Sequence, residues 1–118
     1  MEVDDFDQRL TAIRRRFASS LDGRIEDTFA ALPAISGEGP QAIEAVSASY
    51  FRIHEISGVG PVIGFAETGR MARDVEAVLI GAFRAGRGLT AEESEHLETR
   101  LDALRAAARI ELQNGSGI

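Results

Sequence analysis

The chain has 118 residues, of which 44% are hydrophobic and 27% are charged, as is typical of one folded, soluble domain. Its net charge of −6 argues against binding to nucleic acid or to an anionic membrane surface, because both need a basic face. The absence of cysteine excludes disulfides, thiol catalysis and zinc–thiolate sites, and an acidic N-terminus without a long apolar run indicates a cytoplasmic protein.

The first predicted helix covers residues 4–32. Its apolar residues recur every three or four positions and predict one buried stripe: Phe6, Leu10, Ile13, Phe17, Leu21, Ile25 and Phe29. Either Asp4 or Asp5 could cap its start, and Gly23 could weaken or bend it. Pro33 and the run from Ser36 to Pro40 then end the helix.

The second predicted helix covers residues 40–59. Pro40 suits its first position, where a missing N–H has no cost. The predicted core stripe consists of Ile43, Val46, Tyr50 and Ile53. This helix should end near Gly58–Pro61, because the ring of Pro61 clashes with the carbonyl of Ser57 in a straight helix.

Two further helices are predicted over residues 65–85 and 91–113. The third ends around Gly86 and Gly88, and Thr90 with Glu93 forms a capping box at the start of the fourth. The inward stripes are Phe65, Thr68, Ala72, Val75, Leu79 and Ala82 in the third helix, and Leu97, Leu101, Leu104 and Ala108 in the fourth. With no strand pattern, residues 1–118 are predicted to form one all-α domain, an up-and-down four-helix bundle.

His54 is the candidate for chemistry. A rotation of 100° per residue places it roughly 90° from the centre of the buried stripe, on the shoulder of the second helix. Its helical neighbours on that side, Ser47, Phe51 and Gly58, are uncharged. An exposed strip of this kind resembles a docking face more than an ordinary solvated surface.

Gly58 has two explanations from spacing alone. A glycine inside a helix destabilises it by roughly 1 kcal/mol relative to alanine, so its presence needs a reason. Another molecule could have to approach the imidazole at this point, which a side chain would prevent. Alternatively, Gly58 belongs to the helix terminator together with Gly60 and Pro61.

Three stretches together resemble the signature of histidine-containing phosphotransfer (HPt) domains of bacterial phosphorelays: His54–Gly58, Gly64–Phe65 and Met71–Glu76. In that family, the histidine is followed by an apolar residue at +2, commonly by lysine at +3, and by glycine at +4. A Gly-Phe pair and a Leu-Ala-x-x-Leu-Glu-like segment come next. This chain departs from the pattern at +3, where it has Ser57.

The resemblance implies that His54 accepts a phosphoryl group from the aspartate of a receiver domain and passes it to another receiver. Such a phosphoprotein has no kinase activity of its own and needs no cofactor or metal, because the receiver holds the Mg²⁺. The implied partners are receiver domains of response regulators and a hybrid histidine kinase, and the family favours a monomer. Around His54, the residues expected to form the docking and phosphate environment are Ser47, Tyr50, Phe51, Ser57 and Gly58.

Ser57 keeps a second hypothesis open. The family's lysine would offset the negative charge of phosphohistidine, which Ser57 cannot do; Arg70 and Arg73 are candidate substitutes. Without that cation, the chain could instead be a degenerate HPt-like adaptor that binds receivers or other partners through the Phe51 face. His96 lies among glutamates and is expected to be solvated, and two histidines without a third ligand do not predict a metal site.

Overall fold

Four long helices and two short 3₁₀ turns make up the computed structural model, which describes residues 2–115 and the side chains of residues 5–115. In chain order they are α1 (Glu2–Ala31), η1 (Leu32–Ala34), α2 (Pro40–Val59), η2 (Gly60–Ile63), α3 (Ala66–Ala85) and α4 (Ala91–Gln113). In this part of the chain, the only β-type pairing is an isolated bridge between Ser36 and Leu89. The all-α prediction is confirmed, and the helix bounds differ from the predicted ones by at most two residues.

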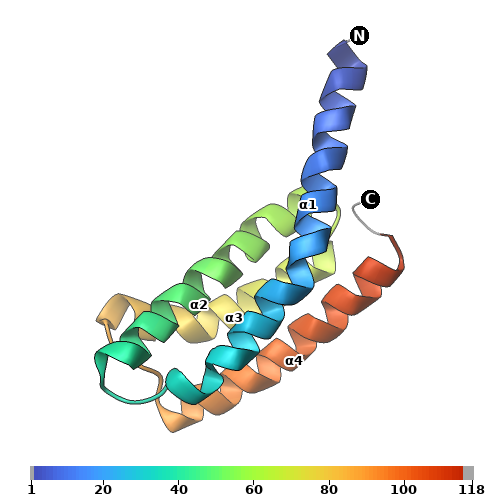
Figure 1. Cartoon of the computed structure of the whole chain (residues 1–118). Helices are drawn as coiled ribbons and strands as arrows, with labels where there is room; N and C mark the ends of the chain where they lie inside the picture. Colours follow the sequence, from blue (N-terminus) through green and yellow to red (C-terminus); the bar gives the residue numbers. More distant parts are fainter. Residues whose placement is uncertain (1, 116–118) are drawn as a thin grey trace.

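The helices pack as a compact bundle around one core (Figure 1). α2 packs chiefly on α3 and α3 on α4, while α1 contacts both α2 and α4. Phe65 is fully buried near the α2–α3 connection, and its ring lies 5.1 Å from that of Phe17, centroid to centroid. None of the helices within residues 2–115 combines the length and the apolar character that crossing a membrane requires.

The connection between α2 and α3 sets how these two helices face each other. α2 ends at Val59, as expected from Pro61, and the chain continues through η2 to Gly64, which has a φ of 97°. The backbone N–H of Phe65 then donates to the carbonyl of Gly60 at 2.8 Å. The ring of Pro61 packs against Gly69, where it leaves no room for a Cβ atom.

The predicted end of α3 and the predicted start of α4 are confirmed. Gly86 closes α3 with a φ of 66°. The hydroxyl of Thr90 accepts from the backbone N–H of Glu93 at 3.1 Å, and the Glu93 carboxylate accepts from the backbone N–H of Thr90 at 2.9 Å. This reciprocal pair is the capping box at the start of α4.

The predicted stripe of the first helix is wrong in its N-terminal part. Phe6 is 62% exposed and Ile13 is 45% exposed, because α1 extends beyond the bundle before Phe17 (Figure 1). α1 also begins at Glu2, so Asp4 and Asp5 lie within the helix rather than at its start. Asp5 accepts a hydrogen bond from Arg9 at 3.1 Å instead.

One smaller expectation also changes. Ile43, assigned to the core of the second helix, is 37% exposed in the first turn of α2, where Ala42 is the buried residue instead. α1 is continuous through Gly23, which lies at an exposed position.

Candidate functional site

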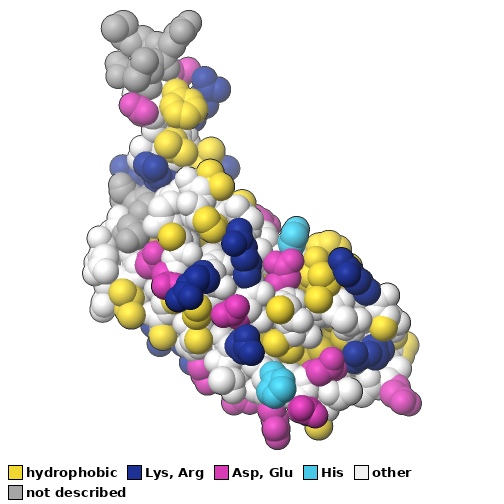
Figure 2. Space-filling model, turned by 180° about the vertical axis from the view of Figure 1, so that it is seen from behind, with side chains coloured by type: hydrophobic (Ala, Val, Ile, Leu, Met, Phe, Trp, Pro, Cys, Tyr) yellow, Lys and Arg dark blue, Asp and Glu magenta, His cyan; other side chains and the backbone are white. Residues whose placement is uncertain are grey.

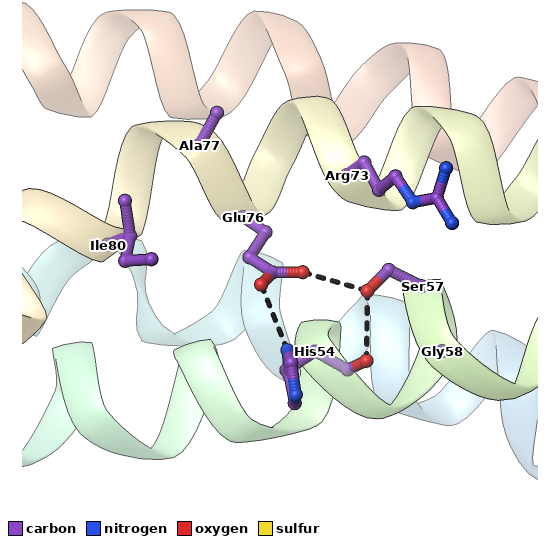
Figure 3. Close-up of a pocket in the computed structure, with 7 residues that line it drawn as sticks. All are labelled: His54, Ser57, Gly58, Arg73, Glu76, Ala77 and Ile80. Atoms are coloured by element: carbon purple, nitrogen blue, oxygen red, sulfur yellow. Dashed lines mark hydrogen bonds and ion pairs between the residues drawn. The ribbon is translucent and has the colours of Figure 1, made fainter.

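His54 projects from α2 beside α3, and 58% of its side chain is exposed. Its Nδ1 lies 2.9 Å from Oε2 of Glu76 on α3 (Figure 3). An ionised carboxylate can only accept hydrogen bonds, so this contact assigns the proton to Nδ1. The lone pair of the neutral ring is therefore on Nε2, which has no hydrogen-bond partner within the described residues.

Glu76 is held in place by a second hydrogen bond. Its Oε1 accepts from the hydroxyl of Ser57 at 2.7 Å, and its side chain is only 18% exposed. Although burial opposes ionisation, the hydrogen bonds from Ser57 and His54 keep the pKa of the Glu76 carboxyl below its ordinary value. Ser57 also lies 2.9 Å from the carbonyl of His54, but it has one hydrogen, and the charged oxygen is the stronger acceptor.

The structure thus gives Ser57 a role that the sequence did not suggest. Ser57 is buried and fixes the carboxylate that orients the imidazole, rather than facing an incoming phosphate from an exposed position. In the sequence, Glu76 stands out only as part of the family pattern. The signal for its proximity to His54 is its spacing: both residues lie eleven positions from Phe65, and two antiparallel helices joined at Phe65 bring such pairs together.

Aromatic side chains also pack beside the imidazole. The ring of Tyr50 is stacked 5.5 Å from that of His54 and 4.3 Å from that of Phe83 on α3. Phe51 packs edge-on against Phe83 at 5.3 Å and remains 58% exposed. Tyr50 therefore belongs both to the core and to the site, and the contribution of Phe83 was not predicted.

A shallow open groove of about 520 Å³ runs between α2 and α3 beside the imidazole (Figure 3). It is lined by His54, Ser57, Gly58, Arg73, Glu76, Ala77 and Ile80. Ser47 is half-buried and does not line it.

Gly58 forms a side-chain-free edge of this groove. It lies within α2 at an exposed position, and a Cβ atom there would meet nothing within 4 Å. The left-handed residue of the connection is Gly64, six positions later. Gly58 is therefore helical in the last turn of α2, and both explanations of it stay open.

Of the two candidate cations, only Arg73 lines the groove. Arg70 donates to Glu67 on its own helix, with 3.1 Å between Nη2 and Oε2. Arg73 is exposed and forms no hydrogen bond or ion pair with the described residues. It is therefore free to contact a ligand in the groove.

His96 lies apart from this site, exposed on α4. Across the part of the chain that the structure describes, no group of three or more histidine, aspartate or glutamate side chains is arranged to hold a metal ion. No protein-family model, curated protein or solved structure matches this chain.

Proposed function

We propose that this protein is a phosphorelay intermediate that carries a phosphoryl group on His54. The observation that supports it best is the 2.9 Å contact between Nδ1 of this exposed histidine and the Glu76 carboxylate. This contact leaves the lone pair on the outward nitrogen, Nε2, as a nucleophile needs. The resemblance of residues 54–76 to the HPt signature points to the same chemistry.

In the proposed step, Nε2 attacks the phosphorus of an aspartyl phosphate on a receiver domain. The N–P bond forms as the P–O bond to the aspartate breaks, and the aspartate leaves as a free carboxylate. Positive charge develops on the ring during the attack, and the Glu76 carboxylate at Nδ1 stabilises it. The reverse reaction, with a second receiver, returns the phosphoryl group to an aspartate.

The surface around His54 suits a transient contact with such a receiver. Phe51 offers an exposed apolar ring on one side, and Gly58 leaves the groove open on the other. Arg73 can neutralise part of the charge of the phosphoryl group from the far wall.

A second candidate is an adaptor that binds receivers without accepting phosphate. It is favoured by the charge beside the imidazole, where Glu76 contributes a negative charge and Ser57 replaces the family's lysine. In this case the exposed surface around Phe51 would still bind the receiver, but no phosphohistidine would form.

Incubation with a phosphorylated receiver and Mg²⁺ separates the two functions. We expect acid-labile, alkali-stable label on the wild type, none on His54→Gln, and normal labelling of the control His96→Gln. The melting temperature of His54→Gln should stay close to that of the wild type, because the ring is largely exposed. If the wild-type protein binds the receiver but is not labelled, the protein is an adaptor. If His54→Gln is labelled, a residue other than His54 accepts the phosphoryl group.

A further inference from the structure

The first turns of α1 form an apolar surface that the bundle covers only in part. We call residues 5–16 the projecting segment, since Phe17 is the first buried residue of the helix. Figure 1 shows α1 extending beyond the other helices, and Figure 2 shows hydrophobic side chains on this extension next to acidic and basic ones. Phe6 and Ile13 are exposed here, whereas Leu10 is partly buried against the core of its own chain and presents only its remaining surface.

The spacing of these residues is that of a helix–helix seam. Phe6, Leu10, Ile13 and Phe17 alternate by four, three and four positions, which is the a/d pattern of a coiled coil. An apolar seam of this kind in water is stabilised when a second helix covers it.

A small groove lies where the projecting segment meets the bundle. It has a volume of about 200 Å³ and is lined by Ile13, Arg16, Phe17, Arg24, Glu55 and Val59. Three of these side chains are apolar, and Arg24 forms an ion pair with Glu55 across the groove, at 3.3 Å. Apolar walls with two arginines at the rim suit an aromatic side chain that has acidic neighbours.

Phe6 is such a side chain, because Asp5 and Asp7 flank it. We propose that the projecting segments of two copies of this chain pack antiparallel, so that Phe6 of each copy occupies the groove of the other. In this register, Leu10 of one copy packs on Ile13 of the other. Phe6 then lies opposite Phe17, which lines the groove.

Charge and shape favour the antiparallel orientation. Asp7 and Arg14 are seven residues apart on the same side of the seam, so antiparallel copies bring Asp7 of one beside Arg14 of the other. On the opposite side, Arg9 would approach the second copy's Arg16, and the exposed ion pair between Arg9 and Asp5 offsets this like-charge contact only in part. A parallel pair would align like charges and bring the two bundles together at the same end.

The dimer should be weak and should leave the candidate site accessible. The twelve residues of each projecting segment give an interface near the low end of the size range, so we expect a dissociation constant of about 10 µM or higher. The groove for Phe6 and the groove beside His54 share no residue. This proposal replaces the monomer implied by the family resemblance, and it does not depend on the phosphotransfer function.

Sedimentation equilibrium of the full chain from about 10 µM to 1 mM tests the proposal. We expect a reversible monomer–dimer equilibrium and a dissociation constant at least tenfold higher for Phe6→Ala and for Ile13→Ala. Ile43→Ala is the matched control, because it removes the same partly exposed side chain at the rim of the bundle, outside the groove and the seam. A chain that stays monomeric at 1 mM, or a dimer that Phe6→Ala and Ile13→Ala do not weaken, would overturn the proposal.

A charge exchange tests the orientation. Asp7→Arg alone should weaken the dimer at least tenfold, because it places two arginines side by side, and the double variant Asp7→Arg/Arg14→Asp should restore it. A dimer strengthened by Asp7→Arg, or one that the double variant does not restore, would be inconsistent with antiparallel packing and would refute the proposal.

Discussion

At the scale of single residues, Glu76 decides which nitrogen of His54 carries the proton. Its carboxylate accepts from Nδ1 on one side and from Ser57 on the other. Removing its charge while keeping its shape therefore isolates the electrostatic contribution. The exposed Glu55 lies next to His54 in the chain but pairs with Arg24, so it provides a control.

We predict that Glu76→Gln lowers the rate of phosphoryl acceptance by about tenfold, or about 1.4 kcal/mol in activation free energy, because the charge that stabilises the ring is lost. Glu55→Gln should react at the wild-type rate. Single-turnover transfer from a phosphorylated receiver gives the rates, and ¹⁵N NMR of the imidazole gives the tautomer. A wild-type rate and an unchanged tautomer in Glu76→Gln would show that the carboxylate does not orient His54.

At the scale of secondary-structure elements, the start of α4 is stabilised by an ion pair as well as by its cap. Arg87 Nη1 lies 2.8 Å from Oε1 of Glu93, the same carboxylate that accepts from the backbone of Thr90. These hydrogen bonds, with that from Arg87 the largest contribution, lower the pKa of Glu93 to about 2. Because the pKa is lower in the folded state, the stabilisation is present above the ordinary value of 4.5 and is lost as the pH falls towards 2.

We predict that Glu93→Gln lowers the free energy of unfolding by about 1 kcal/mol at pH 7, as expected for a cap with a partly exposed ion pair. The difference from the wild type should shrink as the pH falls from 4.5 to 2. Urea unfolding at pH 7 and pH 3 measures both effects. Glu92→Gln, one residue earlier in the same turn, should have no effect at pH 7; an equal loss there would indicate a general effect of helix charge.

Two helical glycines should respond to alanine in opposite directions. Gly58 is open to solvent, so Gly58→Ala should stabilise the bundle by up to about 1 kcal/mol. Gly69 contacts the ring of Pro61, so Gly69→Ala should destabilise it by about 1–3 kcal/mol. Chemical denaturation of both variants gives the comparison, and equal stabilities would contradict the packing of Pro61 on Gly69.

Gly58 also separates folding from function. Gly58→Arg should fold, because its side chain would point into solvent beside the groove. If receivers approach over this edge, the variant should transfer phosphate at least tenfold more slowly, a loss of about 1.4 kcal/mol or more. If Gly58→Arg folds and transfers phosphate at the normal rate, receivers do not dock over Gly58.

At the scale of the whole molecule, α1 has two parts that contribute differently to stability. From Phe17 onwards it supplies buried side chains to the core, among them Leu21 and Ile25. Between residues 5 and 9 it has no buried side chain. We therefore expect changes in the two parts of this continuous helix to have different effects on the free energy of unfolding.

We predict that deletion of residues 1–9 changes the free energy of unfolding by less than about 0.5 kcal/mol, measured at a few micromolar. Leu21→Ala should lower it by about 3 kcal/mol, because it leaves a cavity at a fully buried position. Circular dichroism during urea unfolding gives both values. A large loss on deletion would mean that the projecting segment packs against the bundle in solution.

The sequence by itself determined the local structure of this protein. The positions of Pro61, Gly86 and the Thr90–Glu93 capping box defined where helices begin and end, because proline, glycine and caps act on backbone groups a few residues away. Apolar periodicity likewise predicted the helices and the exposed position of His54.

Only the tertiary structure decided which parts of the stripes are buried and what surrounds His54. The same periodicity continues through Phe6 and Leu21, yet only Leu21 meets other helices, because α1 is longer than the bundle. Glu76 and Ser57 came together because the α2–α3 hairpin places them opposite each other. Such contacts depend on how whole helices pack, whereas periodicity and caps describe one helix at a time.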